Sequence, residues 1–102
     1  MVAQVRIPID TDSIARLCRK WHITEFALFG SVLRDDFRPD SDVDVLVTFA
    51  DDAPWTLWDM TDLRDELARE FGRDVDVVSK RGLKNPYRRD HILKTRRVVY
   101  AG

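Results

Sequence analysis

The sequence predicts an α+β fold, in which a small mixed β-sheet has helices packed on it. Helical and strand patterns alternate along the chain, in the order helix, strand, helix, strand, helix, strand, helix, strand. The 102 residues are 44% hydrophobic and 34% charged, a composition typical of soluble globular chains. We find no repeat, low-complexity tract or linker, so we expect a single domain over residues 1–102.

Each expected element follows from a local pattern of caps, apolar spacing or turn residues. Asp10 to Ser13 offer helix N-caps, and apolar residues follow them at helical spacing. Short apolar runs bounded by Gly, Pro or Asp predict the strands. The elements are a helix after residues 10–13, a strand over 25–29, a short helix over 31–35, a strand over 42–49, a long helix from 51–54 to 71, a strand over 74–79, a helix from 85 to about 93 and an edge strand over 97–100.

The long central helix has the clearest pattern. Proline suits the first turn of a helix, so Pro54 places its start at 51–54. Apolar residues then recur at steps of three and four from Met60 to Phe71, and Gly72 ends the helix. Trp55 and Trp58 lie near its start, where they could stack on a base, although a core or interface role is favoured.

Two strands begin with alternating aspartates. Alternate strand residues share a face, so Asp42 and Asp44 should project together. The third strand begins in the same way, and Asp76 would join them if the two strands are neighbours, with Asp74 as its fallback. Such oxygen donors suit Mg²⁺ or Mn²⁺, and two ions about 3.5–4 Å apart could serve a phosphoryl displacement. The alternative is that aspartates at a strand start are solvated turn residues.

A Gly-Ser turn lies just upstream of these aspartates. Gly30 and Ser31 could offer backbone N–H groups and a hydroxyl to an anion. Gly-Ser is also a common turn, so this feature alone has little weight. Combined with the carboxylates, it describes a site for a metal-bound phosphate ester.

Charge is uneven along the chain although the net charge is −1. From Lys80 onward there are eight basic residues and one acidic residue, Asp90. This segment could bind nucleic acid, but we favour a solvated face that balances the acidic part of the fold. No apolar run is long enough for a membrane span and no signal peptide is evident, so we expect a cytoplasmic protein. Cys18, on the apolar stripe of the first helix, should be an inert core residue.

The motifs Phe29-Gly30-Ser31, Arg34 and Arg38-Pro39-Asp40-Ser41-Asp42-Val43-Asp44 resemble the minimal nucleotidyltransferases of the DNA polymerase β superfamily. Residues 75–78 resemble the family's third-carboxylate strand, so the likeness covers nearly the whole chain. It implies the polymerase β-like nucleotidyltransferase fold.

The resemblance also implies roles for individual residues. Asp42, Asp44 and Asp76 would bind two Mg²⁺ ions that hold ATP, and Asp76 would act as base toward the acceptor hydroxyl. Gly30 and Ser31 would cradle the terminal phosphates. Arg34 would add positive charge near the phosphates, or would pair with the neighbouring Asp35 or Asp40.

The chain resembles family members of this size that act as antitoxins of a small helical HEPN protein. The resemblance implies transfer of AMP from ATP to a tyrosine of that partner, which neutralises a toxin. Three alternatives remain open: a binding-only antitoxin, a small-molecule nucleotidyltransferase that needs another subunit, and a nucleic-acid-binding module that uses the basic C-terminal segment.

Overall fold

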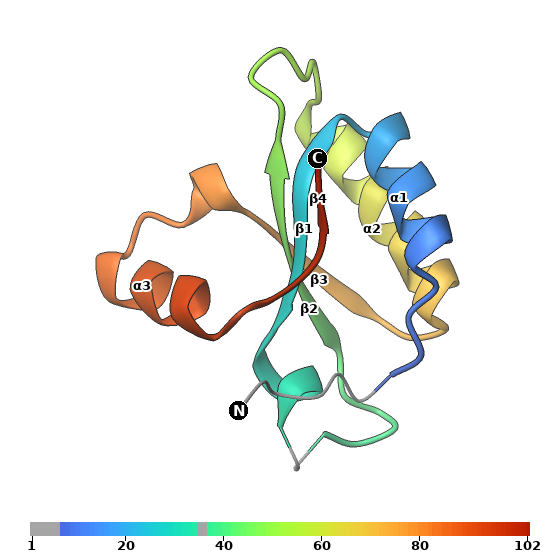
Figure 1. The fold of residues 1–102 in the computed structure, drawn as a ribbon, viewed down its shortest axis with the longest axis vertical. Coiled ribbons are helices and arrows are strands. Elements are labelled where there is room, and N and C mark those ends of the chain that lie inside the picture. Colours follow the sequence, from blue (N-terminus) through green and yellow to red (C-terminus); the bar gives the residue numbers. More distant parts are fainter. Residues whose placement is uncertain (1–6, 35–36) are drawn as a thin grey trace.

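A four-stranded mixed sheet with helices on both faces forms the fold (Figure 1). The computed structural model describes residues 7–34 and 37–102. In chain order the elements are α1 (Thr11–Lys20), β1 (Ile23–Phe29), the 3-10 helix η1 (Gly30–Leu33), β2 (Val43–Phe49), α2 (Leu57–Phe71), β3 (Val75–Ser79), the 3-10 helix η2 (Lys80–Gly82), α3 (Pro86–Thr95) and β4 (Arg97–Ala101). The α+β class and the alternation of helices and strands are confirmed. Within the described ranges, none of the helices combines the length and apolar character that a bilayer crossing requires.

The sheet has the strand order β3-β2-β1-β4. β1 is antiparallel to both β2 and β4, whereas β2 and β3 are parallel and are connected through α2. β4 is an edge strand of the described sheet, as predicted, and the second and third strands are neighbours. Their register places Asp44 opposite Asp76. Two of the predicted site residues therefore lie side by side on adjacent strands.

Side chains of the strands alternate between two apolar layers, one on each face of the sheet. The layer under α1 and α2 includes Ile14, Phe26, Val43, Val45, Val47, Leu63, Leu67 and Val75. The layer under α3 includes Ala27, Phe29, Leu46, Leu83 and Ile92. Figure 1 shows α3 on the opposite side of the sheet from α1 and α2. Because Asp44 and Asp76 alternate with the valines of the first layer, they lie on the face that α3 covers.

The long helix begins at Leu57, so the predicted start at 51–54 was wrong. A capping box determines the start: the Thr56 hydroxyl accepts the Asp59 N–H, and the Asp59 carboxylate accepts the Thr56 N–H at 2.8 Å. These reciprocal bonds satisfy two groups that helix formation would otherwise leave unpaired. Proline is compatible with a first turn, but it supplies no comparable stabilisation at Pro54.

Trp55 belongs to the core, as favoured from the sequence. Its indole N–H donates to the Trp21 carbonyl at 2.6 Å, and the centroids of the two rings are 4.9 Å apart. Trp58, by contrast, is 83% exposed. The buried Cys18 is also a core residue, and burial raises the pKa of its thiol to about 12. The thiol therefore stays protonated and unreactive at neutral pH.

Smaller differences concern element boundaries near the Gly-Ser turn. β1 begins at Ile23, two residues before the predicted start. The short helix is a 3-10 helix over Gly30–Leu33 and not a helix over 31–35. Its predicted last residue, Asp35, lies outside the described residues.

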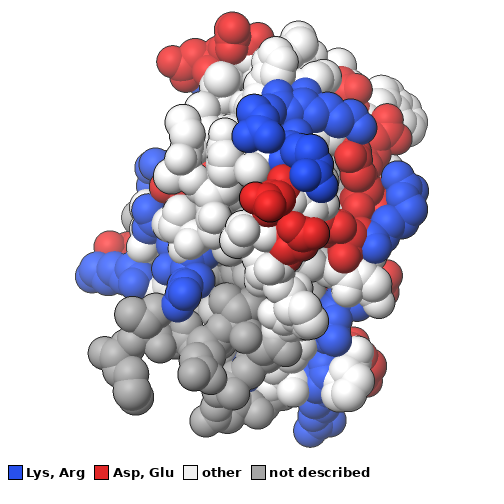
Figure 2. All heavy atoms as spheres, turned by 45° about the vertical axis from the view of Figure 1, so that its right-hand side comes forward, with Lys and Arg blue, Asp and Glu red and all other residues white. Residues whose placement is uncertain are grey.

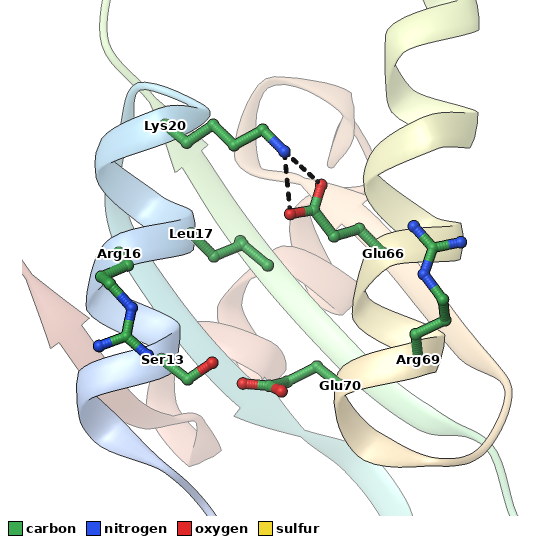
Figure 3. Close-up of a pocket in the computed structure, with 7 residues that line it drawn as sticks. All are labelled: Ser13, Arg16, Leu17, Lys20, Glu66, Arg69 and Glu70. Atoms are coloured by element: carbon green, nitrogen blue, oxygen red, sulfur yellow. Dashed lines mark hydrogen bonds and ion pairs between the residues drawn. The ribbon is translucent and has the colours of Figure 1, made fainter.

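A polar pocket of about 380 Å³ separates α1 from α2, and Figure 3 shows an ion pair at its upper end. Lys20 Nζ lies 3.1 and 3.2 Å from the two carboxylate oxygens of Glu66, and the Trp21 indole N–H donates to the same carboxylate at 2.9 Å. Burial by itself raises the pKa of Glu66, but the hydrogen bonds from Trp21 and Lys20 outweigh burial and leave the pKa below its usual value of 4.5.

Substitution Glu66→Gln should lower the free energy of unfolding by about 1 kcal/mol at neutral pH, because a neutral amide forms weaker hydrogen bonds with both donors. The folded-state pKa is depressed, so this stabilisation is present above the unfolded value of 4.5 and is lost as the pH falls through the folded-state pKa. Urea unfolding from pH 7 to pH 3 measures the difference between wild type and variant. The exposed Glu70→Gln in the same pocket is the control. If the difference in free energy of unfolding between wild type and Glu66→Gln stays the same down to pH 3, the ionised Glu66 carboxylate is not the source of the stabilisation.

Basic residues after Lys80 are partly matched by acidic ones. Arg81 pairs with Asp51 at 3.0 Å, and Arg96 pairs with Glu25 at 3.0 Å. A further pair joins Lys94 and Asp90 at 2.9 Å. On the face that bears α1 and α2, Figure 2 shows basic and acidic side chains interleaved. These pairs agree with the view that the C-terminal basic residues balance the acidic part of the fold.

Candidate active site

The bend at Gly30 lies directly against the carboxylate of Asp44. β1 ends at Phe29, whose register partner on β2 is Asp44. Gly30 follows with φ of +76°, a left-handed conformation that glycine adopts readily. A Cβ added to Gly30 would lie 2.4 Å from Oδ2 of Asp44. The structure thus brings the small-residue bend and the second-strand carboxylate into contact, and only glycine leaves room for both.

Four aspartates line one open pocket of about 430 Å³ at the N-terminal ends of β2 and β3. They are Asp42, Asp44, Asp74 and Asp76. Asp44 and Asp76 are register partners on parallel strands, whose spacing is about 4.8 Å. The rest of the lining comes from Val75 of β3 and from the α2 residues Arg64, Asp65 and Ala68. The pocket therefore collects the carboxylates that open two separate strands.

Asp44 has the most perturbed environment in this group. Burial raises its pKa most, and the negative charges of Asp76 and Asp42 raise it further. The guanidinium groups of Arg34 and Arg88 act in the opposite direction. A partly buried carboxylate with two acidic neighbours would be stabilised by a cation.

The donor chemistry of the pocket fits Mg²⁺, but the side chains are not arranged as a finished metal cluster. Among residues 7–34 and 37–102, no three His, Cys, Asp or Glu side chains are placed to hold a metal ion together. Asp44 and Asp76 nevertheless occupy paired positions, and Asp42 acts electrostatically on Asp44. Like charges repel, which disfavours convergence of these carboxylates. Side-chain rotation on this backbone is the change that a metal site would need.

Asp74 and Asp76 differ in what they can contribute. The backbone carbonyl of Asp74 accepts the Val43 N–H at 3.0 Å, which ties the start of β3 to the start of β2. Asp76 is the register partner of Asp44 and acts on its pKa. Both side chains are exposed in the pocket. The geometry therefore favours Asp76 as the third carboxylate.

Ser31 and Arg34 belong to the bend itself. Ser31 is partly buried in η1, and its carbonyl accepts the Arg34 N–H at 2.9 Å, which closes the 3-10 turn. The positive charge of Arg34 lowers the pKa of Asp44. Of the two acids proposed as pairing partners from the sequence, Asp35 lies outside the described residues.

Sequence reasoning missed Arg73, which holds the loop that leads into β2. Its guanidinium donates to the carbonyls of Arg38 at 3.2 Å and Ser41 at 3.3 Å. It also lies over the ring of Phe37, 4.6 Å from the centroid. The loop is closed by a bond from the Arg38 N–H to the Ser41 hydroxyl at 3.0 Å. Arg73 thereby positions the loop residue Asp42, a role that only the fold reveals.

A second pocket, of about 900 Å³, lies at the other end of β2 and β3. Its walls are largely apolar, and basic residues of η2 and α3 also line it. The lining includes Phe49, Trp55, Met60, Val77, Lys80, Arg81 and Arg89. The four aspartates of the first pocket do not line it. The two pockets are therefore separate sites at opposite ends of the parallel strand pair.

Comparison with known proteins agrees with this fold. Residues 13–99 match the family model for the nucleotidyltransferase domain, which gives the class of the protein. The chain is 37% identical over 86 residues to the protein adenylyltransferase MntA of Thermococcus cleftensis, covering 82% of this chain and 80% of the relative. The chain belongs to the minimal nucleotidyltransferase family.

Solved structures show the same fold. A candidate minimal nucleotidyltransferase superposes with a TM-score of 0.71 at 36% identity, over 85% of this chain and 86% of that one. A complex of the tri-AMPylated HEPN toxin of Shewanella oneidensis with its MNT antitoxin gives a TM-score of 0.66 at 22% identity, over 90% of this chain and 70% of the matched chain. The second likeness shows the fold alone.

Proposed function

We propose that this chain transfers AMP from ATP to a tyrosine hydroxyl of a partner HEPN toxin and so acts as its antitoxin. One observation carries the proposal: Gly30 lies in contact with Asp44, which is itself the register partner of Asp76. The adenylyltransferase relative and the AMPylated toxin complex support the choice of AMP and of a protein acceptor. ATP is available in the cytoplasm, which we propose as the place of action.

Asp42, Asp44 and Asp76 are the proposed ligands of two Mg²⁺ ions, and Mn²⁺ could replace them. Three hard oxygen donors lie at the starts of two neighbouring strands. Burial raises the pKa of Asp44 most and the charges of Asp76 and Asp42 raise it further, and a cation would offset both effects. When bound, Mg²⁺ would neutralise charge on the phosphates and on the leaving pyrophosphate. The described carboxylates supply donors of the right kind at paired positions.

The chain's own residues then bind and orient the reactants. The backbone at Gly30 and the hydroxyl and N–H of Ser31 would hold the terminal phosphates, with Arg34 adding charge. The acceptor oxygen attacks the α-phosphorus and forms the new P–O bond, while the bond to the β-phosphate oxygen breaks and pyrophosphate leaves. Asp76 takes the proton of the acceptor hydroxyl.

Accessibility favours Asp76 for this proton transfer. Asp76 is exposed and lies on β3, an edge strand of the described sheet, whereas Asp44 is partly buried. A tyrosine presented by another protein can therefore approach Asp76 from solvent. An enclosed small-molecule site would need further walls, and the pocket of about 430 Å³ is open.

Intact-mass spectrometry tests the proposal. The chain is incubated with a candidate HEPN partner protein, ATP and Mg²⁺, and the mass increase of AMP is sought on that partner. Wild type should add AMP, and EDTA should stop the reaction. Asp42→Asn and Asp44→Asn should reduce transfer to the detection limit, because each removes a proposed metal ligand.

Asp62→Asn is the matched control, since Asp62 is an exposed α2 aspartate that does not line the acidic pocket. It should transfer AMP as wild type does. A tight complex with no mass change under several nucleotides and metals would instead favour a binding-only antitoxin. Transfer that survives Asp44→Asn would contradict the proposed site.

A further inference from the structure

The large pocket at the C-terminal ends of β2 and β3 has a firmly held apolar wall. Trp55 lines it and is fixed by the 2.6 Å hydrogen bond from its indole N–H to the Trp21 carbonyl. Phe49 and Val77 also line it and pack against the apolar layer under α1 and α2. Its volume of about 900 Å³ lies within the range of roughly 300–1,000 Å³ that is usual for binding pockets. The pocket is therefore already formed and presents apolar surface to a ligand.

The first turn of α2 leaves large apolar side chains in solvent beside this pocket. Leu57 lines the pocket and is 86% exposed, and the next residue, Trp58, is 83% exposed. The capping box between Thr56 and Asp59 fixes the backbone of this turn. Single exposed apolar residues are ordinary, but exposed apolar residues that continue an apolar pocket mark an interaction surface. The first turn of α2 thus extends the apolar wall of the pocket into solvent.

The charged residues that line the pocket are mostly basic. They are Lys80, Arg81 and Arg89, with Asp51 as the acidic member. Asp51 pairs with Arg81 at 3.0 Å, whereas no carboxylate of the described residues pairs with Lys80 or Arg89. Lys80 and Arg89 are partly buried, and partial removal of water strengthens the attraction of a charge to an opposite charge. The pocket therefore has positive charge available for an acidic ligand.

The pocket lies on the same edge strand as the proposed active site. Val77 and Ser79 of β3 line it, and Asp76 of β3 lines the acidic pocket. In the described sheet, β3 pairs only with β2, so its other edge is open. Strand residues rise about 3.3 Å each, so Asp76 and Ser79 are about 10 Å apart along the strand. One protein seated along this edge can therefore contact both pockets.

We propose that this pocket is a docking surface for an acidic, amphipathic segment of the protein that accepts AMP. The inference rests on the proposed function, because it assumes a protein acceptor. Apolar side chains of the segment would pack on Trp55 and Leu57. Its carboxylates would pair with Lys80 and Arg89. Largely apolar walls favour such a segment over a nucleic acid, whose phosphates need charged and polar partners. Docking here would hold the acceptor hydroxyl near Asp76.

Binding of the candidate HEPN partner and AMP transfer to it, measured on the same variants, test this assignment. Leu57→Ala should weaken binding about fivefold through loss of an apolar contact. Arg89→Glu should weaken it about 10-fold, because it reverses a charge at the docking surface. In both variants the KM for the partner should rise in parallel, while kcat at saturating partner stays within about twofold of wild type. High salt should reduce the effect of Arg89→Glu but not that of Leu57→Ala.

Each variant has a matched control outside the pocket. Tyr87→Ala removes an aromatic side chain that is 86% exposed, and Lys84→Glu reverses the charge of an exposed lysine. Neither residue lines the docking pocket or the acidic pocket. Both controls should bind the partner within about twofold of wild type. Thermal unfolding checks that every variant is folded before affinities are compared.

The outcomes separate this inference from the proposed function. If Leu57→Ala or Arg89→Glu binds the partner within about twofold of wild type, or if the wild-type chain does not bind it, the docking assignment is overturned. Sedimentation that shows loss of self-association in these variants, with partner binding unchanged, would overturn it in favour of an interface between two copies of this chain. Partner binding without AMP transfer would overturn the proposed function, while the two binding losses would still support the docking surface.

Discussion

Replacement of Gly30 by alanine should lower AMP transfer by at least about 100-fold, because a displacement of about 1 Å at a reacting group has effects of that size. The added Cβ would lie 2.4 Å from Oδ2 of Asp44, so the carboxylate or the bend must move. The φ of +76° adds about 1–2 kcal/mol of backbone strain for a residue with a side chain. Initial rates of AMP transfer and urea unfolding measure the two effects.

Gly72→Ala separates strain from displacement. Gly72 has nearly the same φ, +69°, but a Cβ there meets no atom within 4 Å. This variant should lose about 1–2 kcal/mol of stability and keep its activity. If Gly30→Ala and Gly72→Ala behave alike in both assays, the contact between Gly30 and Asp44 has no part in catalysis.

Asp76→Asn should reduce the rate of AMP transfer by about 10²–10⁴-fold, the range associated with loss of a general base. The amide can neither accept the acceptor's proton nor contribute a full negative charge to a metal. Loss of the charge should also lower the pKa of Asp44, which Asp76 raises in the wild type. Single-turnover rates across a pH series measure the chemical step separately from product release.

Asp74→Asn is the matched comparison for Asp76→Asn. Both aspartates lie at the start of β3 and line the same pocket, but Asp74 accepts the Val43 N–H through its backbone carbonyl, which the substitution leaves intact. Its rate should therefore remain within a few-fold of wild type. If Asp74→Asn lowers the rate of AMP transfer more than Asp76→Asn does, Asp74 is the third carboxylate. In that case Asp74, and not Asp76, lies next to the acceptor hydroxyl.

Local sequence patterns were sufficient to predict most of the helices and strands. Alternation of valine with aspartate predicted the second and third strands, and apolar spacing predicted α2. The start of α2 was wrong because two signals competed within a few residues: the proline rule at Pro54 and the capping box at Thr56. The capping box forms two hydrogen bonds, whereas proline is only compatible with the first helical turn and adds no hydrogen bond.

The candidate site was predictable where it depended on strand periodicity and not where it depended on neighbours. Asp42, Asp44 and Asp76 could be selected from their positions in similar strands. Arg73 could not, because its contacts join segments far apart in the chain. The sequence does not show which segments a basic side chain contacts, because this depends on how its helix or loop packs.

The amino-acid order by itself determined which side chains share a strand face, since the period of two is a property of the extended backbone. It also determined the set of acids and the small residues of the bend. Tertiary structure decided that β2 lies beside β3, that Gly30 meets Asp44, and that Arg73 holds the loop before Asp42. Those outcomes depend on how the two apolar layers pack against the helices, and packing is a non-local property of the whole chain.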